Sequence, residues 1–117
     1  MTFEEFKLNV MKTAPENDDK HWHLLHGIMG ISTETGELMD VMKKKLAYNK
    51  PADVVNVKEE IGDVLWYVAY IIHTQGWDIE SIMERNIEKL RVRFGEKFSL
   101  DKAIHRDLPA ERKVLEK

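Results

Sequence analysis

The 117-residue sequence contains no cysteine, only three prolines and only six glycines. Without cysteine, the chain has no disulfide, no zinc–thiolate site and no cysteine nucleophile. The scarcity of residues that break helices, together with the lack of alternating valine-rich segments, favours helices over strands. The longest apolar run, residues 64–72, is far shorter than the roughly 20 residues of a membrane-spanning helix, so no membrane partner is expected.

The sequence also lacks a large excess of positive or negative charge. The formal net charge is −3 and no long basic run occurs, so electrostatic binding to a nucleic acid polymer is not expected. The N-terminal residues are acidic and lack the apolar core of a secretion signal. These features predict a cytoplasmic protein, and the length suits one domain.

The spacing of apolar residues predicts an all-α chain. We expect helices over about residues 2–12, 21–46 and 54–75, and a fourth from Asp78 to Phe94 or Phe98. They would form a four- to five-helix bundle within residues 1–98. The charged tail, residues 99–117, would hold a short helix near Ala110–Leu115 or act as an arm on another subunit.

The segment Val64–Ile72 is apolar on every side of the third expected helix. A helix of this kind has to be covered all round, which one small bundle rarely achieves. We therefore expect oligomerisation to complete the bundle. A strand is the alternative for this segment, because its residues are β-branched and aromatic.

Two acidic motifs, Glu34-Thr-Gly-Glu37 and Glu60-Ile-Gly-Asp63, are the main functional signal. In each, two carboxylates are three residues apart, on neighbouring turns of one helix face. At about 100° per residue, both pairs lie on the same flank, at about 80° and about 140° from the centre of the apolar stripe. Antiparallel packing of the two helices would bring the four carboxylates around one cleft. Solvated surface acids are the alternative.

Four carboxylates brought together repel one another, and a cation relieves the repulsion. Oxygen-only ligands suit a hard ion, Mg²⁺ first and Mn²⁺ second. A di-iron site would need Glu-x-x-His motifs, and neither pair has one. Mg²⁺ held by carboxylates usually completes its shell with water and substrate phosphates, so the motifs indicate phosphate chemistry.

Groups that could hold such a substrate lie on the fourth helix and at the start of the second. Asn86 is near the middle of an apolar stripe, where an unpaired amide is costly, and Lys89 and Arg93 follow it. A buried amide bonded to the backbone and a snorkelling lysine are the alternatives. Trp22 would either stack on a base or anchor the end of the bundle.

Three segments resemble the MazG-like, all-α nucleoside triphosphate pyrophosphatases. They are GISTETGELMD at residues 30–40, KEEIGDVLWY at residues 58–67 and NIEKLRVRF at residues 86–94. That family carries E-x-x-E, a spacer, E-x-x-D, and then Asn-x-x-Lys on the following helix. The short chain is similar to stand-alone bacterial or phage-encoded members.

The resemblance implies Mg²⁺-dependent hydrolysis of a (deoxy)nucleoside triphosphate to the monophosphate and pyrophosphate, in a homodimer or homotetramer with active sites at subunit contacts. The implied metal ligands are Glu34, Glu37, Glu60 and Asp63. The implied nucleotide contacts are Asn86, Lys89, Arg93 and, more weakly, Trp22. Either Glu34 or Glu37 would orient the attacking water. Phosphoribosyl-ATP pyrophosphatase activity and a non-catalytic helical interaction module are the alternatives.

Overall fold

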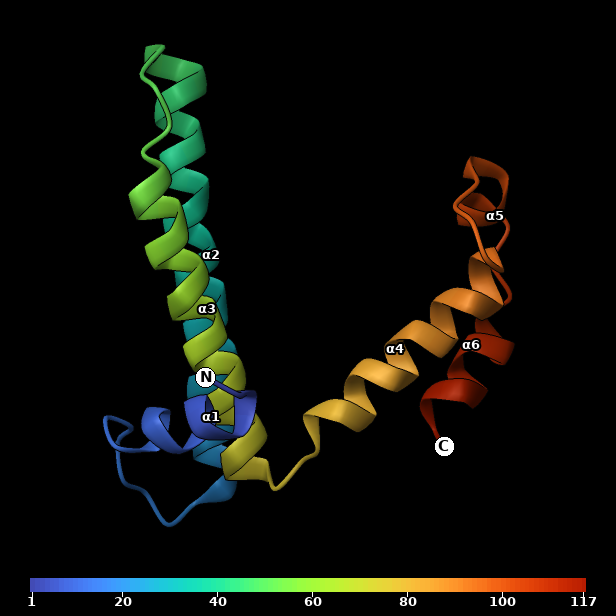
Figure 1. Cartoon of the computed structure of the whole chain (residues 1–117), viewed down its shortest axis with the longest axis horizontal. Coiled ribbons are helices and arrows are strands. Elements are labelled where there is room, and N and C mark those ends of the chain that lie inside the picture. Colours follow the sequence, from blue (N-terminus) through green and yellow to red (C-terminus); the bar gives the residue numbers. More distant parts are fainter. The chain divides into compact units, whose positions relative to one another are not determined.

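The computed structural model describes residues 1–117, and every regular element in it is a helix. The six helices are α1 (Phe3–Met11), α2 (Lys20–Tyr48), α3 (Val54–Gln75), α4 (Ile79–Phe94), α5 (Leu100–Ile104) and α6 (Leu108–Leu115) (Figure 1). The predicted all-α fold is confirmed, and the segment for which a strand was the alternative lies within α3. No helix combines the length and the apolar character that crossing a bilayer requires. The chain divides into two compact units, residues 1–77 and 78–117.

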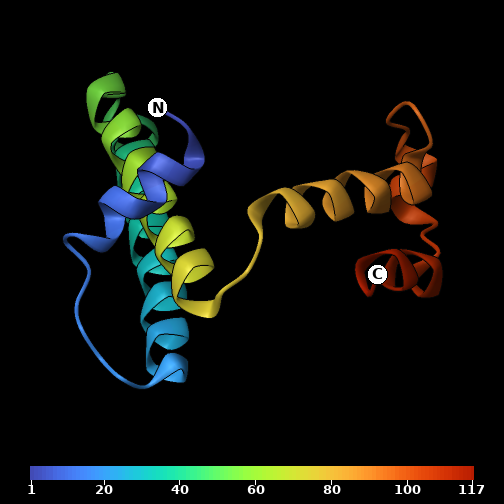
Figure 2. The ribbon, with the colours of Figure 1, turned by 60° about the horizontal axis from the view of Figure 1, so that its bottom comes forward.

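In the first unit, α2 and α3 form an antiparallel hairpin, and α1 lies across α3 (Figures 1 and 2). Thr2, Asp19 and Asp53 begin the three helices, because each side chain accepts a hydrogen bond from a backbone N–H of the first turn. Asn49 ends α2 with a φ of 52°, and Gly76 ends α3 with a φ of 69°. Both caps use the left-handed conformation that stops a helix.

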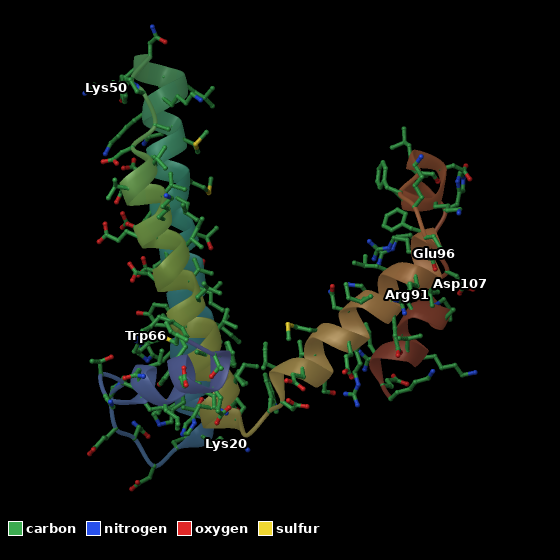
Figure 3. All side chains as sticks on the ribbon, in the orientation of Figure 1. Lys20, Lys50, Trp66, Arg91, Glu96 and Asp107 are labelled. Carbon is green, nitrogen blue, oxygen red and sulfur yellow. The ribbon has the colours of Figure 1, made fainter.

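The core of this unit lies where α1 crosses α3. Val10, Ala69 and Tyr70 are buried there. Around them pack the partly buried side chains of Phe3, Phe6, Met11, Ala14, Trp66 and Tyr67. Trp66, which Figure 3 shows beside α1, stacks on Tyr70 with 5.4 Å between ring centroids. Its indole N–H donates to the hydroxyl of Thr13 at 3.3 Å, so both packing and a hydrogen bond hold α1 in place.

Two buried glycines of α2 allow α3 to approach closely. A Cβ atom at Gly27 would lie 2.8 Å from Cδ1 of Ile71, and a Cβ atom at Gly30 would overlap the ring of Tyr67. A larger residue at either place would force the facing side chain or its helix to move. Gly30 is one turn before Glu34, so this contact also sets the distance between the two acidic motifs.

In the second unit, α5 and α6 pack against α4. As predicted, α4 begins after Asp78, whose carboxylate accepts two backbone hydrogen bonds, and it ends at Phe94. Residues 99–117, expected as a tail, hold α6 where a short helix was predicted, and also α5. The five residues of α5 are too few to give a periodic pattern in the sequence.

The carboxylate of Glu111 joins α6 to α4. Glu111 is only 2% exposed, and its Oε1 accepts a hydrogen bond from Nε of Arg93 on α4 at 2.8 Å. Arg106, just before α6, donates from its Nε to Oε2 at 3.1 Å. A buried carboxylate is costly unless it is paired, and here two guanidinium groups pair it.

We expect the packing of α6 on α4 to weaken in acid. Hydrogen bonding from Arg106, and then from Arg93, lowers the pKa of Glu111 despite its burial. A carboxyl group of this kind stabilises the fold fully above its unfolded pKa, about 4.3, and loses that contribution as the pH falls through the lower folded value. Hydrogen exchange of residues 108–115, corrected for intrinsic rates, should therefore accelerate below about pH 4.3. Protection that stays constant into stronger acid would contradict this role of Glu111.

Candidate metal centre

Carboxylates from α2 and α3 converge on one side of the hairpin. Oxygen atoms of Glu34, Glu60 and Asp63 all lie within 4.8 Å of one another. Glu34 belongs to α2, while Glu60 and Asp63 are one turn apart on α3. The antiparallel pairing of two helices with matching acidic flanks brings these groups together.

Glu60 is the most buried acid of this cluster. It is 8% exposed, and its Oε2 is buried with no hydrogen-bond partner. Hydrogen bonding with Glu34, followed by burial and then by the charges of Glu34, Asp63 and Glu37, raises the pKa of Glu60. A buried polar atom without a partner is costly, and so is a group of like charges. A bound cation would relieve both costs, so the residues present fit a metal.

The donor set suits a hard divalent ion, because every candidate ligand atom is a carboxylate oxygen. Oxygen ligands on opposite sides of such an ion are about 4.2 Å apart for Mg²⁺ and up to about 5.2 Å for the larger Ca²⁺. Separations of up to 4.8 Å fit the coordination sphere of the larger ion as they stand, whereas Mg²⁺ would need the most distant oxygens to move closer together. The cluster could hold a divalent metal with little movement of its side chains.

Glu37, the fourth predicted ligand, lies outside the group of three. It is exposed on α2, one turn beyond Glu34, and its charge still contributes to the raised pKa of Glu60. On its other side, Asp40 pairs with Lys44 at 2.9 Å and is the main cause of the raised pKa of Lys44, to which Glu37 adds. Glu37 thus borders the cluster and keeps an exposed carboxylate.

The predicted substrate contacts on α4 belong to the unit of residues 78–117. Asn86 is exposed, so the alternative of a buried amide bonded to the backbone is wrong. The apolar neighbours Met83 and Ile87 are themselves about half exposed, because nothing in this unit covers that face of α4. Lys89 is half-buried, and the guanidinium of Arg93 donates a hydrogen bond to the carboxylate of Glu111. No pattern in the sequence predicted that pair, whose members are 18 residues apart.

Trp22 lies at the start of α2 and is 39% exposed. Its ring contacts those of His23 and His26, with centroids 5.3 and 5.2 Å away. Both histidines also bond the hydroxyl of buried Tyr70, a partnership that the sequence did not reveal. At about 1.5 Å per residue, Trp22 is about 18 Å along α2 from Glu34, so it is not part of the acidic cluster.

Comparison with known families agrees with these observations. The sequence matches the MazG nucleotide pyrophosphohydrolase domain over residues 25–98, a range that includes both acidic motifs and the predicted contacts on α4. No curated protein and no solved structure matches the chain. The family match covers more than half of the 117 residues, and the all-helical fold and its carboxylate cluster are consistent with it. The chain belongs to the MazG nucleotide pyrophosphohydrolase domain family.

Proposed function

We propose that this protein hydrolyses a (deoxy)nucleoside triphosphate to the nucleoside monophosphate and pyrophosphate, with Mg²⁺ as cofactor and Mn²⁺ as a substitute. Family membership supports nucleotide pyrophosphohydrolase activity in general. The observation that carries the metal-dependent form is the buried, unpartnered Oε2 of Glu60 within the carboxylate cluster. An acidic cluster of this kind repels a triphosphate unless a cation offsets much of its negative charge and coordinates the phosphate oxygens.

The acidic residues are proposed to have two different roles, metal binding and orientation of the attacking water. Glu34, Glu60 and Asp63 would hold the ion, since their oxygens already lie together. When bound, Mg²⁺ neutralises phosphate charge and makes nearby water more acidic. Glu37 was also predicted as a ligand, but its exposed position makes it the better candidate to orient the attacking water and accept its proton.

The residues of α4 are proposed to bind the substrate. Asn86, Lys89 and Arg93 recur at intervals of three and four residues, which places them along one side of the helix. Lys89 and Arg93 would neutralise the leaving pyrophosphate, and Asn86 would bond the nucleotide. Attack by water in line with the leaving group needs no protein nucleophile.

We also propose that the protein assembles as a homodimer or homotetramer. Along α2, apolar side chains are about half exposed or more, namely Leu25, Ile28, Met29, Met39, Met42 and Leu46. Several of them line an open groove of about 630 Å³. Monomeric soluble proteins rarely expose apolar surface that is this continuous, so a second copy is the proposed cover.

A pyrophosphate-release screen over the common nucleoside triphosphates and their deoxy forms tests this function. With Mg²⁺, we expect one monophosphate and one pyrophosphate per triphosphate consumed, and no release once the metal is chelated. In Glu37→Gln, kcat should fall about 100-fold or more, as expected for loss of a general base, while Mg²⁺ still raises the melting temperature. The screen includes phosphoribosyl-ATP, because preferential cleavage of that substrate would favour the alternative activity.

Two results would contradict the proposal. Failure to release pyrophosphate from any substrate, with or without Mg²⁺, would favour the non-catalytic interaction module. Full turnover by Glu37→Gln would remove Glu37 from the mechanism and leave Glu34 as the residue to test.

A further inference from the structure

We infer that Glu111 is the positioning residue for Arg93, and that α6 therefore contributes to substrate binding. The inference rests on the proposed function, in which Arg93 contacts the triphosphate. Glu111 lies beyond residues 25–98, which match the family, so nothing in that match assigns it a role.

The contact fixes one edge of the Arg93 guanidinium. Nε and Nη2 of Arg93 each lie 2.8 Å from Oε1 of Glu111, and Nη1 takes no part in the contact. Because the guanidinium is planar and rigid, a contact at two of its nitrogens sets the direction of its remaining N–H groups. The ring of Phe94, 5.6 Å from the guanidinium carbon, restricts it further. Glu111 thereby orients Arg93 while its Nη1 keeps no hydrogen-bond partner, and this is the group that we infer to meet an anion.

Burial separates this contact from an ordinary surface ion pair. The side chain of Glu111 is 3% exposed and that of Arg93 is 18% exposed, whereas a solvated pair would lose its fixed geometry to water. Arg112 of α6 and Glu116, which caps the C-terminal end of that helix, form another arginine–carboxylate pair, but their side chains are 74% and 59% exposed. That pair provides a matched control for loss of a carboxylate from this part of the chain.

The carboxylate of Glu111 and the two guanidinium groups that contact it carry a net positive charge, which can attract the substrate. Arg106 also bonds Glu111, through Nε to Oε2 at 3.1 Å, so two positive groups share one negative group. Arg106 balances the carboxylate, and the group as a whole keeps a net positive charge. A phosphate could therefore bind to Arg93 without displacing Glu111.

The spacing of residues along α4 places the other two proposed contacts on the same side of the helix as the guanidinium that Glu111 holds. Lys89 is one turn before Arg93, and Asn86 is one turn before Lys89. The three proposed contacts thus follow one side of the helix, and Glu111 fixes the one at its C-terminal end. Losing that restraint should weaken phosphate binding and leave the chemical step unchanged, because the acidic cluster is untouched.

The test compares full-length wild type with Glu111→Gln, which has nearly the same shape but no charge, and with Glu116→Gln as the control. Calorimetry with inorganic tripolyphosphate and Mg²⁺ measures binding without any turnover. We expect Glu111→Gln to bind about tenfold more weakly, the size of one lost charge-assisted hydrogen bond, and Glu116→Gln to bind as wild type does. In kinetics with the best substrate of the screen, KM should rise by a similar factor at unchanged kcat. Equal affinities of wild type and Glu111→Gln would overturn the inference.

Two further comparisons let the test give an answer even if the first variant does not fold or the protein releases no pyrophosphate. If hydrogen exchange shows that Glu111→Gln loses α6, Glu111→Asp replaces it, because aspartate keeps the charge while its shorter side chain holds the guanidinium of Arg93 less closely. A tenfold loss of tripolyphosphate affinity in Glu111→Asp then supports the inference, and unchanged affinity overturns it. If wild type releases no pyrophosphate, the proposed function fails, while the tripolyphosphate comparison still decides the role of Glu111.

Discussion

Replacing Glu60 by glutamine is expected to lower pyrophosphate release by at least about 100-fold and yet to stabilise the metal-free protein. Loss of a group that only supports a metal ligand typically costs 10- to 100-fold, so the loss of a ligand should reach at least the upper end of that range. The stability gain has a separate cause. Glutamine removes one charge from the cluster with Glu34 and Asp63, and its amide N–H can donate to the carboxylate of Glu34.

Thermal unfolding with and without Mg²⁺ measures the gain in stability and the loss of metal binding on one sample, and the pyrophosphate-release assay measures the loss of turnover. Wild type should melt at a higher temperature when Mg²⁺ is added, while Glu60→Gln should start from a higher value and show little further rise. Glu59→Gln is the control, because Glu59 is the adjacent residue on α3 but is exposed. A Glu60→Gln protein that keeps both its turnover and its response to Mg²⁺ would show that the cluster is not the metal site.

The second large effect is expected from Gly30→Ala, which should destabilise the protein by about 1–3 kcal/mol. The new methyl group would occupy the space of the Tyr67 ring. That ring cannot simply swing aside, because it packs edge-on against the rings of His26 and Trp66, with centroids 5.8 and 5.0 Å away. The higher helix propensity of alanine offsets at most about 1 kcal/mol of the cost. Denaturant unfolding measures the change in the free energy of unfolding.

Gly62→Ala provides the control with the opposite sign. Gly62 is also inside a helix, but a Cβ atom there would meet no atom within 4 Å. We expect a gain in stability of about 0.5–1 kcal/mol, because alanine loses less backbone entropy on folding. If both substitutions shifted stability in the same direction, the close approach of α2 and α3 at Gly30 would not explain the result.

The sequence predicted the helices well where local signals mark their ends. The predicted span of α3, residues 54–75, is also its observed span, since Asp53 caps its start and Gly76 its end. The start of α4 was predicted for the same reason, from Asp78. By contrast, α5 has only five residues, and its start at Ser99 lies within a charged segment without periodicity.

Features that depend on contacts between helices were only partly predictable. The helical wheel gave Glu37 and Asp63 the same angle, yet only Asp63 joins Glu34 and Glu60 within 4.8 Å. A wheel describes the direction of a side chain but not how near the other helix lies. The exposure of Asn86 could not be predicted either, because it depends on what covers α4 and not on the position of Asn86 along it.

The hairpin also determines where the chain can change in length. Gly30 faces Tyr67, and four residues further along α2 Glu34 meets Asp63, which is four residues earlier on α3. One residue inserted between Gly30 and Glu34 would turn the helix beyond it by about 100°, so the close contact and the acids could not both keep their partners. The connector of residues 49–53 lies outside this register, and lengthening it costs little free energy. Insertions and deletions compatible with the site are therefore confined to that connector and to the ends of the hairpin.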